Sequence, residues 1–69
     1  MKLLYYPETD SLYIELRPFP AVDSRILNDD VVIDRGEDGQ PVGYDIQYAS
    51  EKPEFIGQLI VGRTAAAAE

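Results

Sequence analysis

The side chains that could take part in chemistry in this sequence are mainly carboxylates. The chain has 13 Asp and Glu residues against 6 Lys and Arg, and it has neither histidine nor cysteine. Catalytic triads of the Ser-His-Asp or Cys-His kind are therefore excluded in their ordinary forms. The usual ligands of structural zinc are missing as well. We expect a protein that is not an enzyme and that carries no cofactor.

The carboxylates gather in two turn segments. Glu8 and Asp10 lie two positions apart in the first, and Asp34, Glu37 and Asp38 surround the second. Two acids in one cleft could act as acid and base if burial separated their pKa values, and oxygen-rich loops can bind Ca²⁺ or Mg²⁺. Acids in hairpin loops more often form turns and stay solvated. A metal-dependent or carboxylate-based enzyme, or a small-ligand binder, using Glu8, Asp10, Asp34 and Asp38 remains the alternative hypothesis.

Five tyrosines form the second chemical feature. Tyr44 and Tyr48 alternate with polar residues and are expected to pack on the core with their hydroxyls at its rim. Tyr13 points to the opposite face of its strand, where Tyr5 or Tyr6 could complete an exposed aromatic patch. Such a patch is typical of a protein interface. The alternative is a cross-strand aromatic pair that only stabilises the sheet.

Two hairpins are predicted to position these side chains. In the first, a strand over residues 2–6 ends at Pro7, which has no N–H to donate. A second strand over 12–17 alternates Leu12, Ile14 and Leu16 with Tyr13 and Glu15, as expected of a half-buried strand.

The second hairpin is marked by the Asp38-Gly39 turn, because glycine takes positive φ without steric cost. A β-branched strand over 31–33 precedes the turn, and a strand over 42–48 follows it. This last strand places Val42, Tyr44, Ile46 and Tyr48 on one face, and Gly43, Asp45 and Gln47 on the other. A short strand over 21–25 is compatible with the residues between the hairpins.

The pattern changes after residue 50. Pro53 and Glu54 fit a helix start, and the apolar residues that follow have helical spacing, although residues 59–61 alone also suit a strand. Gly62 is the expected end of the helix. We predict one α+β domain over residues 1–62, with a flexible Ala-rich tail over 63–69. Its fold is expected to be an antiparallel meander of about four strands, with the C-terminal helix packed on one face.

Size and charge limit the partners. A chain of 69 residues buries a thin core, and without disulfides or zinc the common remedy is oligomerisation. We expect a homodimer formed through a sheet edge or an apolar helix face. The net charge of −7 argues against nucleic acid and against an anionic membrane surface. No signal peptide or membrane-spanning run is recognised, so we expect a cytoplasmic protein.

The two hairpins resemble a family of small bacterial proteins, domain of unknown function 2283 (DUF2283). The first block of the resemblance consists of Tyr5, Pro7, Glu8, Asp10, Leu12, Tyr13 and Ile14. The second consists of Val31, Asp34, Asp38, Gly39, Val42, Gly43, Ile46, Ala49 and Ser50. Tyr6 departs from the pattern, where Asp is usual, and so does Gly36, where an acid is common. The resemblance implies small, uncharacterised, stand-alone proteins, sometimes encoded beside small toxin-like proteins, and it suggests an antitoxin-like role.

These observations lead to one main hypothesis. The chain is interpreted as a non-enzymatic protein-interaction module that binds a small basic, toxin-like protein. Tyr13, Glu15 and Asp45 are expected on the outward sheet face and are the predicted interaction surface.

Overall fold

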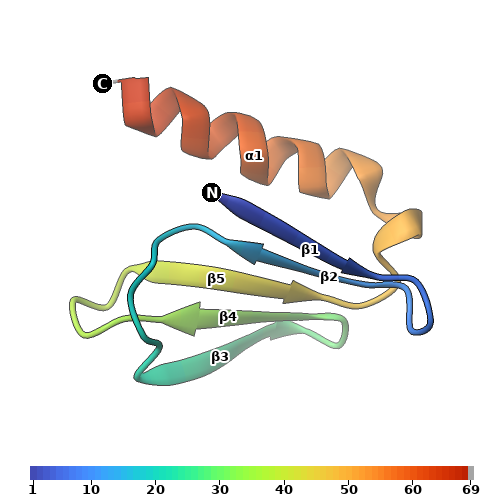
Figure 1. The fold of residues 1–69 in the computed structure, drawn as a ribbon, viewed down its shortest axis with the longest axis horizontal. Helices are drawn as coiled ribbons and strands as arrows, with labels where there is room; N and C mark the ends of the chain where they lie inside the picture. The colour runs from blue at the N-terminus through green and yellow to red at the C-terminus, as the bar shows by residue number, and fades with distance from the viewer. Residues whose placement is uncertain (69) are drawn as a thin grey trace.

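The fold is a five-stranded antiparallel sheet with one long helix on one side (Figure 1). The computed structural model describes the backbone of residues 1–68 and the side chains of residues 1–61. In chain order the elements are β1 (Lys2–Tyr6), β2 (Ser11–Glu15), β3 (Asp23–Asn28), β4 (Val31–Arg35), β5 (Pro41–Ile46), the short 3₁₀ helix η1 (Ala49–Glu51) and α1 (Pro53–Ala68). The predicted α+β class is confirmed.

The strand order is β1-β2-β5-β4-β3, so β2 and β5 lie inside the sheet. The predicted meander of about four strands is corrected here: there are five strands, and β2 pairs with β5 instead of with the next strand along the chain. The reason is burial. Strands β2 and β5 carry most of the buried apolar residues and need neighbours on both sides, whereas β1 and β3 are exposed throughout and form the edges. The segment over residues 16–22, with Pro18 and Pro20, connects the centre of the sheet to its far edge.

The core lies between the sheet and α1. Ile14, Val31 and Ile46 are fully buried, and the register brings them together, since Ile46 is the cross-strand partner of Val31 on one side and of Leu12, two residues before Ile14, on the other. The helix covers this cluster with Phe55, Ile56 and Leu59. Burial of one such aliphatic side chain stabilises the fold by about 1.5–3 kcal/mol. The two layers therefore hold together through a small apolar contact.

The helix confirms one prediction and corrects another. Residues 53–61 are helical and not a strand, with Pro53 and Glu54 in the first turn. The helix does not end at Gly62 but continues to Ala68, because alanine has the highest helix propensity and offsets the cost of about 1 kcal/mol for one glycine. The predicted flexible tail is thus helical up to residue 68. Its flexibility stays a prediction, and residue 69 lies outside the described residues.

Several strand boundaries also differ from the prediction: β2 is Ser11–Glu15 and not 12–17, and β4 continues to Arg35. The third strand is Asp23–Asn28 and not 21–25, and β5 ends at Ile46, two residues before Tyr48. Tyr48 therefore leaves the core face; its φ is +53° and its side chain is 55% exposed. It precedes η1, where its ring stacks under the Lys52 ammonium. Tyr44 does pack against the core cluster as expected.

Candidate functional site

Asp10 ties the first hairpin to the start of the helical segment. Its carboxylate accepts hydrogen bonds from the Tyr5 hydroxyl at 2.7 Å, from the Ser50 hydroxyl at 2.7 Å and from the Ser50 backbone N–H at 3.0 Å. Its carbonyl accepts a further bond from Ala49 N at 2.9 Å. The Ser50 hydroxyl, followed by that of Tyr5, lowers the pKa of Asp10 because these bonds favour the charged form. Asp10 thus acts as a structural latch between residues 40 positions apart.

Asp38 forms a second latch in the β4–β5 loop. Arg17 binds its carboxylate with both terminal nitrogens, at 2.9 and 3.0 Å, and Gln40 N donates to it at 3.0 Å. These contacts lower the pKa of Asp38 to about 2, with the Arg17 hydrogen bonds as the largest cause. The next residue, Gly39, has a φ of +79°, as the turn signal predicted.

The four carboxylates of the alternative hypothesis do not come together. Glu8 and Asp10 lie in the β1–β2 turn at one end of the sheet, and Asp38 lies in the β4–β5 loop at the other end (Figure 1). Asp34 is in strand β4 itself. Across the described residues, no group of three or more Asp and Glu side chains is placed to hold a metal ion. The predicted acidic loops are therefore separate latches and turns, and they do not form one cleft.

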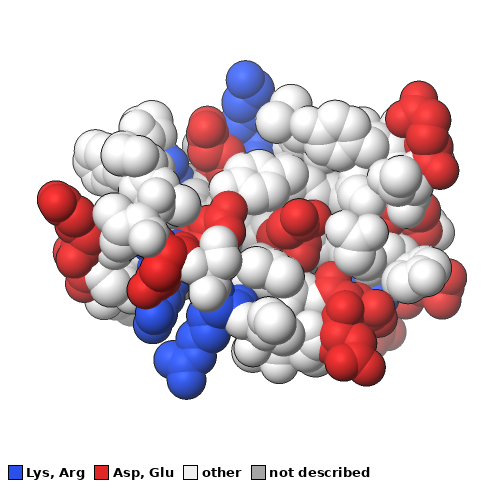
Figure 2. All heavy atoms as spheres, turned by 90° about the horizontal axis from the view of Figure 1, so that it is seen from below, with Lys and Arg blue, Asp and Glu red and all other residues white. Residues whose placement is uncertain are grey.

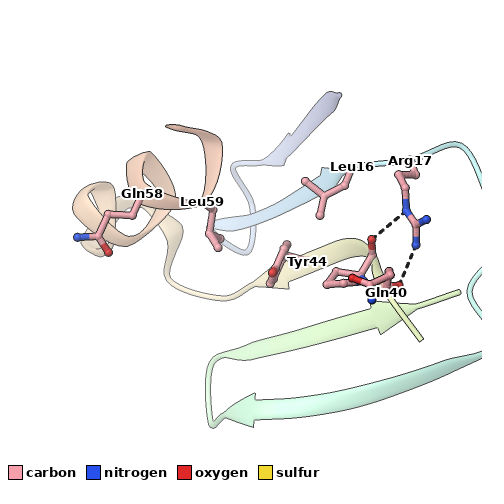
Figure 3. Close-up of a pocket in the computed structure, with 7 residues that line it drawn as sticks. Leu16, Arg17, Gln40, Tyr44, Gln58 and Leu59 are labelled. Atoms are coloured by element: carbon pink, nitrogen blue, oxygen red, sulfur yellow. Dashed lines mark hydrogen bonds between the residues drawn. The ribbon is translucent and has the colours of Figure 1, made fainter. Parts of the chain in front are cut away.

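A groove lies between α1 and the sheet. It has a volume of about 390 Å³ and is lined by Leu16, Arg17, Gln40, Pro41, Tyr44, Gln58 and Leu59. In Figure 3, Leu59 of the helix and Tyr44 of the sheet point toward each other. Arg17, the one charged residue among the described lining residues, donates to the carbonyls of Pro41 and Gln40 at 3.2 and 3.0 Å and also binds Asp38. Within the part of the chain whose side chains are described, the groove wall therefore offers a ligand no charged group that is not already bonded.

The centre of the open sheet face, opposite α1, is built around Tyr13. Its hydroxyl donates to Asp34 Oδ2 at 2.9 Å, and Ser24 donates to Asp34 Oδ1 at 2.7 Å. The Tyr13 ring lies over Gly43, where an added Cβ would overlap the ring and its hydroxyl. Gly43 is thus required so that the tyrosine can cross β5 and reach Asp34 on β4.

Besides burial, the charges of two further carboxylates, Glu15 and Asp45, help to raise the pKa of this tyrosine. Burial and the Asp34 hydrogen bond raise the pKa of Tyr13 to about 12, and the charges of Asp34, Glu15 and Asp45 add to the rise. The register places Glu15 on the strand of Tyr13 and Asp45 directly opposite it. The electrostatic potential at the Tyr13 hydroxyl is therefore negative, because all three neighbouring charges have the same sign.

The outward placement of Tyr13, Glu15 and Asp45 follows the strand alternation expected from the sequence. Figure 2 looks at the molecule from the side away from α1 and shows acidic side chains across this surface. Asp45 accepts a bond from Gln47 at 3.3 Å, and neither Asp45 nor Glu15 has an ion pair among the described residues. We call Tyr13, Glu15, Asp34 and Asp45 the open-face cluster.

Sequence reasoning missed two members of this surface. Asp34 was expected in the second loop, and Ser24 was not singled out, yet both meet at the centre of the open face. The alternation of Val31 and Ile33 toward the core already implied that Asp34 faces outward. Of the other tyrosines, Tyr6 shares the open face with Tyr13, while Tyr5 pairs with Leu12 on the helix side. The aromatic patch can therefore include Tyr6 but not Tyr5.

The architecture defines a small two-layer α+β protein whose antiparallel sheet is covered on one face only. The sequence model of the family described as protein of unknown function (DUF2283) matches residues 2–50, which span all five strands and the start of η1. The chain therefore belongs to this family. Comparisons with curated proteins and with solved structures gave no match.

The family-motif residues have structural roles in this chain. Tyr5, Asp10 and Ser50 form the first latch, and Asp38 and Gly39 belong to the second. Leu12, Ile14 and Val42 are buried. Pro7 and Glu8 are exposed in the β1–β2 turn. Tyr13, Asp34 and Gly43 form the hydrogen-bonded centre of the open face. The motif thus holds the sheet together and at the same time builds its uncovered surface.

Among the described residues, neither α1 nor η1 is long and apolar enough to cross a bilayer.

Proposed function

We propose that this protein is a non-enzymatic protein-interaction module, and that its open sheet face binds a small basic protein. The observation that supports this most strongly is the open-face cluster. Glu15 and Asp45 flank the Tyr13 hydroxyl, lack ion-pair partners in the described part of the chain and contribute to the raised pKa of that hydroxyl. Carboxylates without an ion-pair partner gain one when a lysine or arginine of another protein docks against them.

Three cations form their ion pairs away from this surface, while Lys2 is a cation on the open face as the cross-strand neighbour of Glu15. Arg17, Arg35 and Lys52 are bound to Asp38, Asp23 and Asp30, all outside the open-face cluster. The net charge of −7 would steer a basic protein toward this molecule and speed its association. Tyr13 supplies the amphipathic aromatic that interfaces favour. The surface thus combines charge for steering with an aromatic anchor at its centre.

The lowered pKa values of the turn carboxylates support a binding role rather than a catalytic one. Asp10 and Asp38 accept several hydrogen bonds each, and in both the pKa is lowered. A general acid needs its pKa raised toward neutrality, so these groups are held in the opposite state. We propose accordingly that the protein has no catalytic activity of its own.

The class of partner follows from charge and from the family resemblance. A small basic, toxin-like protein in a bacterial cytoplasm would be neutralised by binding to the acidic face, which is an antitoxin-like role. The interaction would be sensitive to salt, because the exposed charges that guide it are screened within about 10 Å at 0.1 M ionic strength.

Affinity capture with matched variants tests the proposal. The tagged chain, the open-face variant Glu15→Lys/Asp45→Lys and the control variant Glu8→Lys/Glu37→Lys are each incubated with native lysate at low salt. Both variants replace two carboxylates by two ammonium groups, so each changes the net charge from −7 by four units, to −3. Glu8 and Glu37 are exposed in the two turns, away from the open-face cluster.

The expected result is one stoichiometric basic protein bound by the wild type and by the control variant, released at high salt and lost with the open-face variant. Equal loss in both variants would mean that only overall charge matters. Retention by the open-face variant would place the interaction elsewhere. Either outcome contradicts the proposed surface.

A further inference from the structure

The two edges of the sheet differ in how they are protected. The β3 edge carries the Asp23–Arg35 ion pair and the Ser24–Asp34 hydrogen bond, and its register is interrupted between Ile26 and Asn28. Charges and bulges of this kind prevent edge-to-edge pairing. The β3 edge is therefore poorly suited to adding another strand.

Among the described residues, the β1 edge has no such ion pair and no interruption of its register. Its five residues are all exposed, although α1 runs above β1 in Figure 1. Four of them are the large apolar or aromatic residues Leu3, Leu4, Tyr5 and Tyr6, between 37% and 51% exposed. Its register with β2 is regular from end to end, and Lys2 is its single charged residue. An exposed, regular, apolar edge strand is a template for pairing with another chain.

We propose that β1 pairs with β1 of a second copy of this chain, in an antiparallel arrangement centred on Leu4. The strand is self-complementary in this register. Leu4 faces Leu4 of the second copy, Leu3 faces Tyr5, and Lys2 faces Tyr6. Leu3 and Tyr5 both lie on the helix side, and Lys2, Leu4 and Tyr6 all lie on the open side, so every residue meets one from the same face.

The pairing is of the isologous type that two-fold dimers use. An antiparallel pair of identical strands has its two-fold axis perpendicular to the sheet. The two sheets would therefore join into one, with both helices on the same side and both open faces on the other. The two open-face clusters would then lie on the same face of one sheet, separated by the open-side residues Lys2, Leu4 and Tyr6 of the two β1 strands.

The composition of β1 and its exposed area favour a second copy as the occupant. Two molecules of net charge −7 repel each other, but β1 has no acidic residue, and across the axis the Lys2 ammonium would lie near the Tyr6 ring of the second copy. The exposed side chains of residues 1–6 leave surface on the order of 1,000 Å² for two chains, which is the lower end of a specific interface. The thin core of a 69-residue chain gains from such burial.

The test compares the two edges by sedimentation equilibrium over a range of protein concentrations. The wild type is expected to have twice the mass of the chain. Leu4→Lys places two ammonium groups opposite each other on the axis and is expected to give monomers. Ile26→Lys makes the same kind of change on the β3 edge, where Ile26 is 76% exposed, and is expected to stay dimeric. A monomeric wild type at millimolar concentration, or a dimer that survives Leu4→Lys, would overturn the proposal.

A cross-link keeps the proposal testable if Leu4→Lys does not fold. The chain has no cysteine, so Leu4→Cys and Ile26→Cys each introduce a single thiol. Directly opposed strand residues have Cβ atoms about 4.5–5.5 Å apart, and only the closer pairs come within disulfide reach. On mild oxidation Leu4→Cys is expected to form a disulfide-linked dimer at concentrations where Ile26→Cys does not. Equal cross-linking of both variants would show collision alone and contradict the β1 register. This outcome is independent of whether a basic partner is captured.

Discussion

The two faces of strand β2 show how one short sequence serves two purposes. Ile14 points toward α1 and is completely buried in the core. Its neighbour Tyr13 points the other way, crosses Gly43 of β5 and bonds to Asp34 of β4. The core cluster of the covered face is apolar and depends on shape, whereas the centre of the open face is polar and negatively charged. The family motif therefore cannot be interpreted as one site, because its alternate residues belong to different layers.

The largest effect is expected from the covered face. Ile14→Ala should lower the free energy of unfolding by about 2–5 kcal/mol, because it removes buried methyl groups and leaves a cavity. The core of so small a domain supplies only about 3–5 kcal/mol, so the variant is expected to be largely unfolded. Ile26→Ala on the exposed β3 edge is the control, with a change within about 0.5 kcal/mol. Denaturant titration followed by circular dichroism measures both. Equal losses would mean that the core does not lie under α1.

The next effect concerns the crossing of Tyr13 over Gly43. Gly43→Ala should destabilise the fold by about 1–3 kcal/mol, since the new methyl group needs the space of the Tyr13 ring. In a Tyr13→Ala background the same substitution should cost less, because the ring is gone. The coupling of the two changes is obtained from a double-mutant cycle of unfolding free energies. Strict additivity would contradict the contact between the two residues.

A smaller effect is expected from the Tyr13 hydroxyl. Tyr13→Phe should cost about 0.5–1 kcal/mol at neutral pH, the low part of the range for a hydrogen bond, because the pair is partly exposed. The pKa of Tyr13 is raised from 10 to about 12 in the folded protein. The stability linked to this shift is therefore present below pH 10 and is lost as the pH rises from 10 to 12.

The matching measurement follows unfolding at several alkaline pH values. The wild type is expected to lose more stability than Tyr13→Phe between pH 10 and pH 12. Parallel curves for the two proteins would show that folding does not raise the pKa of Tyr13.

The smallest effect on stability is expected from the two flanking carboxylates. Glu15→Lys/Asp45→Lys should change the free energy of unfolding by no more than about 0.5 kcal/mol per site, as is usual on a surface. The same variant should lower the pKa of Tyr13, because both charges help to raise it. Phenolate absorbance, with Tyr13→Phe used to identify the signal, measures the shift. An unchanged titration of Tyr13 would mean that Glu15 and Asp45 do not act on the centre of the open face.

Local features of the fold could be predicted from the sequence, and long-range ones could not. The alternation of Leu12 and Ile14 with Tyr13 and Glu15 gave β2 and its two faces correctly, because strand geometry imposes a period of two residues. The pairing of β2 with β5 and the Asp10–Ser50 latch depend on which surfaces remain uncovered once all strands have formed. No short-range pattern contains that information.

For the candidate surface too, the sequence predicts which face a residue lies on but not which residues meet there. Strand alternation alone predicts that Glu15 and Asp45 face outward. That both lie close to Tyr13 follows only from the register, which places Asp45 opposite Tyr13. Asp34 was assigned to a turn because its neighbours Gly36 and Asp38 are turn residues, yet β4 extends to Arg35. The sheet register brings its carboxylate to Tyr13, 21 residues away.

The most direct test of this division between a folding face and a binding face is a map of amide chemical-shift changes. The isotope-labelled chain is titrated with the basic protein retained in the capture experiment. We expect changes concentrated at Tyr13, Glu15 and Asp45 on β2 and β5, with α1 unaffected. Changes concentrated along α1 or in the Asp10 and Asp38 turns, with an unperturbed open face, would contradict it.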